Sequence, residues 1–281
     1  MSGLHTGEPR TRIALTIAGS DSSGGAGIQA DLKTFSAFGV YGASVITALT
    51  AQNTRGVQGV EVVSPTFVEA QLHSVLSDLE VDAIKTGMLA TANVVTTVAR
   101  VLREAGPRPL VVDPVMVATS GDVLLAQDAV DAVRTSLLPL ATLATPNIPE
   151  AAVLLGADQA RTEDEMVSQA KALHASVGCQ AVLIKGGHGT SDAAVDVLVS
   201  ATGVDRFVRP RVSTRHSHGT GCTLSAAIAA LLAQGAPLKE AVDRAKAFVW
   251  EGLRHGRTLG VGHGAGPVDH LFAVRRAPPP A

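Results

Sequence analysis

The stretch IALTIAGSDSSGGAG (residues 13–27) holds the pattern that decides the fold. Its apolar, β-branched start predicts a buried strand, and the glycines that follow predict a tight turn at the strand's carboxyl end. Gly19 and Gly24 have the spacing of a phosphate-binding G-x-x-x-x-G-K-[ST] loop, but Gly25 stands in place of the lysine and Ala26 in place of the hydroxyl residue. This turn is therefore expected to hold something other than a triphosphate.

Short β-branched runs alternate with longer helical segments along the rest of the chain. The alternation is typical of an α/β fold in which helices cover both faces of a mostly parallel sheet. The runs 195–200 and 206–212 follow each other without a helix between them, which predicts a small edge hairpin. The other predicted strands are 13–18, 44–49, 60–63, 83–87, 110–115, 140–146 and 181–186, and the clearest helices are 67–79, 94–106, 223–235 and 237–256.

Length and composition indicate one folded domain. The 281 residues are 46% hydrophobic and 17% charged, which favours a substantial core over disorder. No linker, composition shift or internal repeat divides the chain. We expect a single domain over residues 13–272, between a disordered tail at 1–12 and a loose tail at 273–281.

Several classes of partner and location are disfavoured. A net charge of −2 and an aromatic content of 3% argue against nucleic acid. No apolar run is long enough for a membrane span, and no signal peptide is evident. Cys179 and Cys222 lack the spacing of a zinc site, so a reducing cytoplasm is the expected location.

The segment HGTGCT, from His218 to Thr223, is the best candidate for binding phosphate. Gly219 and Gly221 let successive backbone N–H groups turn towards one anion, and the helix that follows adds a favourable dipole. Cys222 falls in the first turn of that helix, where a thiol is expected to have a depressed pKa and to act as a base or nucleophile. A plain glycine-rich loop and a buried core cysteine are the alternatives.

Two carboxylates stand near other strand ends. Asp113 follows the run LVV, and Glu150 follows Asn147 where a strand gives way to a helix. Such a pair can hold Mg²⁺ through water when phosphates supply the remaining ligands. Glu150 can equally be an acid that stabilises the first turn of its helix. Lys185, followed by two glycines, can reach a nucleotide phosphate or lie solvated in a turn.

The first glycine-rich turn suits a neutral ligand that forms hydrogen bonds. Asp21 and Asp31 flank it, and Gln52 follows the next strand. An amide that both donates and accepts can bind an aminopyrimidine edge, although a surface glutamine has the same appearance.

Taken in order and spacing, these motifs resemble the bacterial hydroxymethylpyrimidine and phosphomethylpyrimidine kinases of thiamine biosynthesis, members of the ribokinase-like superfamily. The resemblance runs from about Ile13 to about His270 and is specific, because its motifs are much longer than a generic glycine pattern. Thr119 stands where some relatives have lysine. The motifs are GSDSSGGAGIQADLKT (19–34), TAQNT (50–54), IKTGMLA (84–90), VVDPVMVATSG (111–121), TPNIPEAA (145–152), KGGH (185–188) and HGTGCTLSAAIAA (218–230).

The resemblance implies a ribokinase-like three-layer αβα sandwich. It implies that ATP and Mg²⁺ are used to phosphorylate 4-amino-5-hydroxymethyl-2-methylpyrimidine to its monophosphate and then to the diphosphate. A homo-oligomer, in the form of a dimer, is expected, with no nucleic-acid or membrane partner. The implied site is an anion hole at Gly219, Thr220, Gly221 and Cys222 with Cys222 as base, a pyrimidine pocket at Gly19, Asp31, Gln52, Met88 and Val115, metal ligands Asp113 and Glu150, and nucleotide contact Lys185.

Three other functions share part of this pattern. A pyridoxal or pyridoxine kinase of the same superfamily stays open, although such enzymes typically have aspartate at the position of Cys222. A catalytically silent binding protein is disfavoured because Cys222, Asp113 and Glu150 are all present. A dinucleotide-dependent oxidoreductase is disfavoured because the first loop lacks the G-x-G-x-x-G spacing.

Overall fold

The computed structural model describes residues 10–116, 127–187 and 192–276. In these residues one nine-stranded sheet forms the centre of the molecule, and six consecutive strands of it, β2, β1, β4, β5, β6 and β7, run parallel. Both edges are antiparallel: β3 pairs with β2, and β8 and β9 follow β7. In sheet order the strands are β3 (Gly56–Val62), β2 (Tyr41–Asn53), β1 (Ile13–Asp21), β4 (Ala83–Thr86), β5 (Leu110–Val112), β6 (Leu143–Ala144), β7 (Ala181–Lys185), β8 (Ala193–Ser200) and β9 (Gly203–Pro210).

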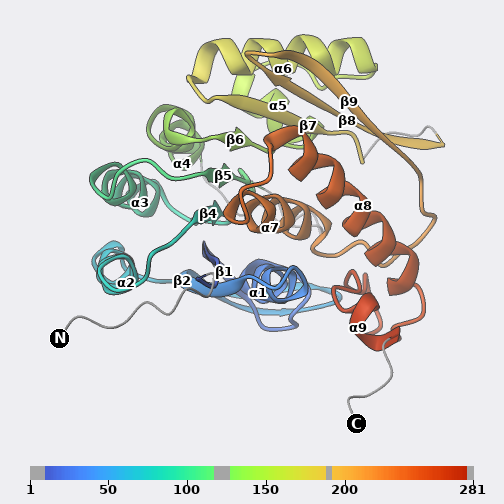
Figure 1. Ribbon diagram of the computed structural model, residues 1–281, viewed down its shortest axis with the longest axis horizontal. Helices are drawn as coiled ribbons and strands as arrows, with labels where there is room; N and C mark the ends of the chain where they lie inside the picture. Colours follow the sequence, from blue (N-terminus) through green and yellow to red (C-terminus); the bar gives the residue numbers. More distant parts are fainter. Residues whose placement is uncertain (1–9, 117–126, 188–191, 277–281) are drawn as a thin grey trace.

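Helices cover both faces of the sheet, as the strand–helix alternation predicts (Figure 1). Helices α2 to α6 pack on one face, whereas α1, α7 and α8 pack on the other. The helices are α1 (Gly27–Ala37), α2 (Pro65–Leu76), α3 (Ala92–Glu104), α4 (Gln127–Ala132), α5 (Ile148–Leu155), α6 (Glu163–Val177), α7 (Thr220–Ala233), α8 (Leu238–Gly256) and α9 (Phe272–Arg276).

Alternating strand residues build the two hydrophobic layers. On β1, Leu15 and Ile17 belong to the layer under α2 to α6, whereas Ala14 belongs to the layer under α7 and α8. This follows from the two-residue period of a strand, and full burial on both faces explains why the parallel strands read as continuous apolar runs. Helix α7 is buried almost all round, so it too is apolar on every side.

Local signals account for where several helices start. Ser64 caps α2 by accepting a hydrogen bond from the N–H of Phe67, with Pro65 in the first turn. Thr162 and Glu165 form a capping box at α6, each side chain accepting from the other residue's backbone N–H.

The predicted strands and the β8–β9 hairpin are confirmed, and so is the three-layer αβα sandwich around a mostly parallel sheet that the resemblance implied. Two strands are shorter than expected: β5 ends at Val112 and β6 at Ala144. Proline follows each end closely, at 114 and 146, and contributes no N–H to a ladder. The antiparallel pairing of β3 with β2 was not anticipated.

The expected tails are shorter than the sequence suggested. Arg10 and Arg12 both reach Asp82, at 2.6 and 2.9 Å, so residues 10–12 are anchored beside β1. Residues 273–276 belong to helix α9, where Arg275 pairs with Asp269 at 2.6 Å. Ion pairs hold both segments, with a residue distant along the chain in the first case and with one six positions away in the second, and composition alone does not reveal either. Among the described residues, no helix has the length and apolarity needed to cross a membrane.

Candidate active site

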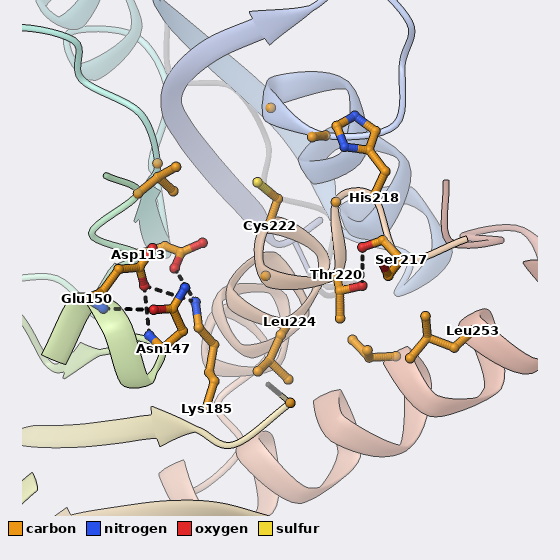
Figure 2. Close-up of a pocket in the computed structure, with 18 of the residues that line it drawn as sticks. Asp113, Asn147, Glu150, Lys185, Ser217, His218, Thr220, Cys222, Leu224 and Leu253 are labelled. Carbon is orange, nitrogen blue, oxygen red and sulfur yellow. Dashed lines mark hydrogen bonds and ion pairs between the residues drawn. The ribbon is translucent and has the colours of Figure 1, made fainter. Parts of the chain in front are cut away.

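A cavity of about 820 Å³ opens where the parallel strands end and helix α7 begins. In an open α/β sheet this is the edge at which ligands bind. Strand β1 contributes Gly19 and Asp21, the segment after β5 contributes Asp113, and α7 contributes its first turn. Figure 2 shows the acidic residues and Lys185 on one side of this turn and His218 on the other.

The first turn of α7 has the geometry of an anion-binding site. Gly219 precedes the helix with a φ of 79°, and a Cβ there would lie 1.9 Å from the carbonyl oxygen of Gly25. Only glycine fits this conformation and this close approach. Thr220 donates its hydroxyl to the Ser217 carbonyl oxygen at 2.5 Å, which tightens the turn. The N–H of Thr220 donates to the Ser217 carbonyl oxygen at 3.2 Å, and that of Thr223 donates to the Gly219 carbonyl oxygen at 2.8 Å. The N–H groups between them, those of Gly221 and Cys222, are the ones in this turn that can bind a ligand in the cavity.

Cys222 lines the cavity within that turn, but its predicted acidity is wrong. Burial raises the pKa of the Cys222 thiol to about 11, and the carboxylates of Asp31 and Asp113 add to this effect. Lys85 and the backbone N–H of Gly27 act in the opposite direction without overcoming burial. The helix terminus alone therefore does not make this thiol a thiolate near neutral pH.

Asp113, Glu150 and Lys185 form a charged cluster at the ends of β5, β6 and β7 (Figure 2). The Lys185 Nζ lies 2.7 Å from Asp113 Oδ1 and 3.8 Å from Glu150 Oε2. Asp113 also accepts hydrogen bonds from Thr145 and Ser225, at 3.2 Å each. Both proposed readings of Glu150 are compatible with its position, because it lines the cavity and also forms a capping box with Asn147.

The charges of this cluster are unequally compensated. Burial opposes ionisation of Asp113, but Lys185 and Lys85 outweigh it and hold the Asp113 pKa below its usual range. Burial raises the pKa of Glu150 to about 7; Lys185 opposes this rise, and Asp113 adds to it. Within the described residues no three His, Cys, Asp or Glu side chains gather as a metal site. Two carboxylates with incomplete compensation fit a Mg²⁺ ion that takes its other ligands from water and phosphate.

The first glycine-rich loop encloses a carboxylate of the protein itself. Asp21 accepts hydrogen bonds from the N–H groups of Ser23, Gly25 and Ala26, at 2.8, 3.1 and 2.8 Å. His218 Nε2 approaches the same carboxylate at 2.7 Å. Burial opposes ionisation, but the hydrogen bond with His218 and those from the loop hold the Asp21 pKa far below its usual range. The loop resembles a phosphate loop because it binds an anion, which is the Asp21 carboxylate.

This hydrogen bond between Asp21 and His218 joins the two loops of the site and was not predicted. Asp21 and His218 are 197 residues apart, and neither was assigned a role beyond its motif. The glycine at position 25 was a usable signal in the sequence, because a glycine can mark a close approach of another part of the chain. In the structure a Cβ at this position would lie 2.4 Å from the His218 ring. The side-chain amide nitrogen of Gln52 lies 3.4 Å from His218 Nε2, so the pair also borders the expected pyrimidine pocket.

Four of the five residues expected in that pocket line the cavity: Gly19, Gln52, Met88 and Val115. A Cβ at residue 19 would lie 2.7 Å from the terminal methyl of Met88, so the glycine leaves room for this wall. Asp31 was expected there and does not line the cavity. It is fully buried and pairs with Lys85 beneath the cavity floor, at 2.7 and 2.8 Å.

The opposite end of the cavity was missed by sequence reasoning. Trp250 and Leu253 of α8 line it together with Leu224 of α7, giving an apolar wall. Lys246 and Asp196 also line it and form a buried ion pair at 2.7 Å. Nothing in the sequence singled these residues out, because they stand in ordinary helix and strand segments without a motif. The Thr119 position considered earlier lies outside the described residues.

Comparisons with known proteins agree with this geometry. The family model described as phosphomethylpyrimidine kinase matches residues 21–269. A hydroxymethylpyrimidine/phosphomethylpyrimidine kinase of Salmonella typhimurium is 55% identical over 260 residues, which cover 92% of this chain and 97% of that protein.

Two solved structures are similar to this chain over most of its length. The pyridoxal kinase of Bacillus subtilis, solved as an ADP complex, has a TM-score of 0.87 at 40% identity and covers 95% of this chain and 100% of its own. The phosphomethylpyrimidine kinase of Clostridium difficile has a TM-score of 0.76 at 42% identity, covering 86% of this chain and 99% of its own. With the strand-end cavity and the glycine turn of α7, these matches show that the chain belongs to the phosphomethylpyrimidine kinase family.

Proposed function

We propose that this protein uses ATP to phosphorylate 4-amino-5-hydroxymethyl-2-methylpyrimidine, and then phosphorylates the monophosphate to the diphosphate. One observation carries the proposal: the first turn of α7 faces a single cavity that has a hydrogen-bonding wall at Gln52 and a charged cluster at Lys185. The name and identity of the Salmonella relative support the same substrates.

The acceptor is proposed to lie against Gly19, Gln52 and Met88. The amide of Gln52 both donates and accepts, which suits the edge of an aminopyrimidine. The thioether of Met88 is adaptable and packs well against a flat ring. In this position the hydroxymethyl group points towards the first turn of α7, where the phosphoryl group is transferred.

ATP is proposed to place its adenine against Trp250, Leu253 and Leu224, and its phosphates between α7 and Lys185. The apolar wall removes the base from water, whereas the ammonium and the helix N–H groups neutralise phosphate charge. Mg²⁺, held through Asp113 and Glu150, would supply further neutralisation of the β- and γ-phosphates when bound.

The first phosphorylation is a displacement at the γ-phosphorus. The substrate hydroxyl oxygen forms the new O–P bond while the bond to the β–γ bridging oxygen breaks, and that oxygen keeps the electron pair as ADP leaves. The base is proposed to be Cys222: its thiolate, a minor form near neutral pH because the thiol pKa is about 11, accepts the hydroxyl proton as the bond forms. In the second phosphorylation the attacking oxygen belongs to a phosphate that is already ionised, so this step has little need of a base.

The test is a direct assay of ATP and Mg²⁺ with the hydroxymethylpyrimidine, its monophosphate and pyridoxal in parallel. We expect both pyrimidines to be phosphorylated. The variant Asp113→Asn, purified in the same way, controls for contaminating kinases and should lose activity on both. Turnover of pyridoxal alone would refute the proposal, since the Bacillus subtilis structural relative is a pyridoxal kinase.

A cytoplasmic homodimer is proposed as the working form. Two unpaired cysteines suit a reducing compartment. Exposed hydrophobic side chains lie on the β2–β3 edge: Val60 and Val62 share one face of the strand pair and are 45 and 39% exposed, and Leu49, on the other face, is 49% exposed. Apolar patches of this kind often mark association sites. Sedimentation equilibrium should give the mass of two chains, and a monomer at all concentrations would refute the dimer.

A further inference from the structure

The C-terminal segment GHGAGPVDH (residues 262–270) has no part in the site described so far, yet it runs beside the start of α7. The N–H of His218 donates to the Gly266 carbonyl oxygen at 3.1 Å, and the N–H of Val268 donates to the His218 carbonyl oxygen at 3.3 Å. This segment thus fixes both backbone groups of the residue before Gly219. Residues 262–270 are all described, and none of them lines the cavity.

Two glycines of α8 make room for the segment. Gly252 and Gly256 are four residues apart and so lie on one face of that helix. A Cβ at residue 252 would lie 2.5 Å from a methyl carbon of Val268, and one at residue 256 would lie 3.0 Å from the Pro267 carbonyl oxygen. The N–H of Asp269 donates to the Gly252 carbonyl oxygen at 3.1 Å. Close packing on the α8 backbone therefore gives the segment a fixed place beside α7.

His270 ends the segment and contacts Thr223 of α7. The His270 Nε2 lies 2.9 Å from the Thr223 hydroxyl oxygen, and that hydroxyl donates to the Gly219 carbonyl oxygen at 2.7 Å. A hydroxyl has one hydrogen, which Thr223 already donates to Gly219, so the His270 Nε2 is the donor to Thr223. His270 and Thr223 are 4 and 0% exposed, so both bonds are shielded from water.

The His270 ring is uncharged at neutral pH. Burial lowers the pKa of its imidazole to about 4, an effect to which Lys33 adds and which Asp269 does not overcome. An uncharged imidazole carries a single N–H, and the contact with Thr223 places it on Nε2. The ring therefore serves as a fixed N–H donor rather than as an acid or a base.

This chain of hydrogen bonds ends on the peptide group that opens α7. The Gly219 carbonyl oxygen accepts from the Thr223 N–H at 2.8 Å as well as from the Thr223 hydroxyl. Gly219 has no side chain to restrict its backbone, so these two donors fix the plane of its peptide group with Thr220. The N–H groups of Gly221 and Cys222 follow directly along the chain, and their direction depends on that plane.

We propose that His270 and Thr223 are positioning residues for phosphoryl transfer: the hydrogen bonds from His270 through Thr223 to the Gly219 carbonyl aim the N–H groups of Gly221 and Cys222 at the transferred phosphoryl group. The inference rests on the proposed role of the first turn of α7 and deepens it. Both phosphorylations use this turn, so both depend on the two residues, whereas the base is needed mainly in the first.

Steady-state kinetics of the full chain tests the proposal. Thr223→Val keeps the shape of the side chain and removes the hydroxyl. We expect kcat to fall by about tenfold for both phosphorylations, less than an ångström of displacement would cause, while KM for the pyrimidine stays within about twofold. Thr223→Ser keeps the hydroxyl and His270→Gln keeps an N–H donor, so both should retain kcat within about threefold. An unchanged kcat in Thr223→Val, or an equal loss in Thr223→Ser, would overturn the proposal.

A double-mutant cycle tests whether the two residues act through the same carbonyl. His270→Leu should lower kcat by about fivefold. Thr223→Val/His270→Leu removes both polar partners, so no buried donor is left unpaired to impair folding, and its loss should be about tenfold, as in Thr223→Val alone. A loss of about 50-fold, the product of two independent effects, would refute a shared chain of hydrogen bonds.

Thr34 of α1 provides a matched control. It is fully buried, and its hydroxyl donates to the Ala30 carbonyl oxygen four residues earlier at 2.7 Å, as the hydroxyl of Thr223 does to Gly219. Thr34→Val should lower Tm about as much as Thr223→Val does and leave kcat within about twofold of the parent. An equal loss of kcat in Thr34→Val would assign the effect to stability and refute the positioning role.

Nucleotide binding separates this inference from the proposed function, because it needs no acceptor. In calorimetric titrations with Mg²⁺, Thr223→Val should weaken the binding of AMP-PNP, an ATP analogue with a γ-phosphoryl group, by about fivefold and that of ADP by less than twofold. If the parent phosphorylates neither pyrimidine but this difference is found, the proposed substrates fail and the inference stands. If the parent phosphorylates both and Thr223→Val matches it in turnover and in binding, only the inference fails.

Discussion

Replacing Gly219 by alanine tests whether the anion turn depends on its contact with the first glycine-rich loop. The backbone at Gly219 has a φ of 79°, where an L side chain costs about 1–2 kcal/mol. The added Cβ would also lie 1.9 Å from the Gly25 carbonyl oxygen and 2.9 Å from its carbonyl carbon. The two loops must then move apart by about an ångström, a displacement that can lower a rate by about 100-fold.

Gly235 provides a matched control at the other end of the same helix. It has a φ of 84°, but a Cβ there would meet no atom within 4 Å. Gly235→Ala therefore carries the backbone strain without the collision, and should lower Tm by about 2–6 °C with kcat unchanged. Gly219→Ala should lower Tm further and reduce kcat by about 100-fold for both phosphorylations.

The assay combines thermal denaturation with steady-state kinetics on the pyrimidine and on its monophosphate. Since both reactions use the same anion turn, both rates should fall together in Gly219→Ala. A wild-type kcat in Gly219→Ala would refute the proposed role of this turn. An equal loss of kcat in Gly235→Ala would show that helix strain, rather than the contact with Gly25, is responsible.

Three further predictions concern single side chains of the site. Cys222→Ala should slow the first phosphorylation by about 100-fold or more and the second by less than tenfold, and equal losses in separate assays of the two steps would contradict the assignment of Cys222 as base. Glu150 has its pKa raised from 4.5 to about 7, so its contribution to stability is complete below pH 4.5 and is lost as the pH rises through 7. Glu150→Gln keeps the capping box. In urea denaturation it should remove up to about 3 kcal/mol of the decrease in the free energy of unfolding between pH 4.5 and neutral pH, and an unchanged decrease would argue against a buried, uncompensated carboxylate. The two carboxylate oxygens of Asp21 accept from three backbone N–H groups, and Asp21→Asn replaces one of these oxygens by an NH2 group that cannot accept. The variant should cost about 1–3 kcal/mol in the same measurement while raising KM for the pyrimidine, and unchanged values of both would contradict its role in holding the loop.

Local signals in the sequence predicted most of the fold. Apolar runs of four to seven residues marked the parallel strands, because strands buried on both faces need no alternation of polar residues. Two neighbouring runs without a helix marked the β8–β9 hairpin. The second antiparallel edge, β2 with β3, was missed because strand direction depends on pairing partners rather than on residue preference.

The candidate site was predicted in position more fully than in chemistry. Polar residues at strand ends were expected to converge, and they do: the Lys185 Nζ lies 2.7 Å from Asp113 Oδ1 and 3.8 Å from Glu150 Oε2. The placement of Asp31 in the pyrimidine pocket was wrong, since its neighbours in the sequence do not show which side of α1 meets Lys85. Trp250 and Leu253 were missed because an apolar helix face looks the same whether it covers core or cavity.

The sequence by itself determined the alternation of strands and helices, the glycines that only certain turns require, and the order of the polar clusters along the chain. These features depend on backbone conformation and hydrophobic periodicity over a few neighbouring residues. Only the tertiary structure decided that the first glycine loop encloses Asp21, which meets His218 at a separation of 197 residues. It likewise decided that the Cys222 thiol has a pKa of about 11, because burial and the charges of Lys85, Asp31 and Asp113 come from other parts of the chain.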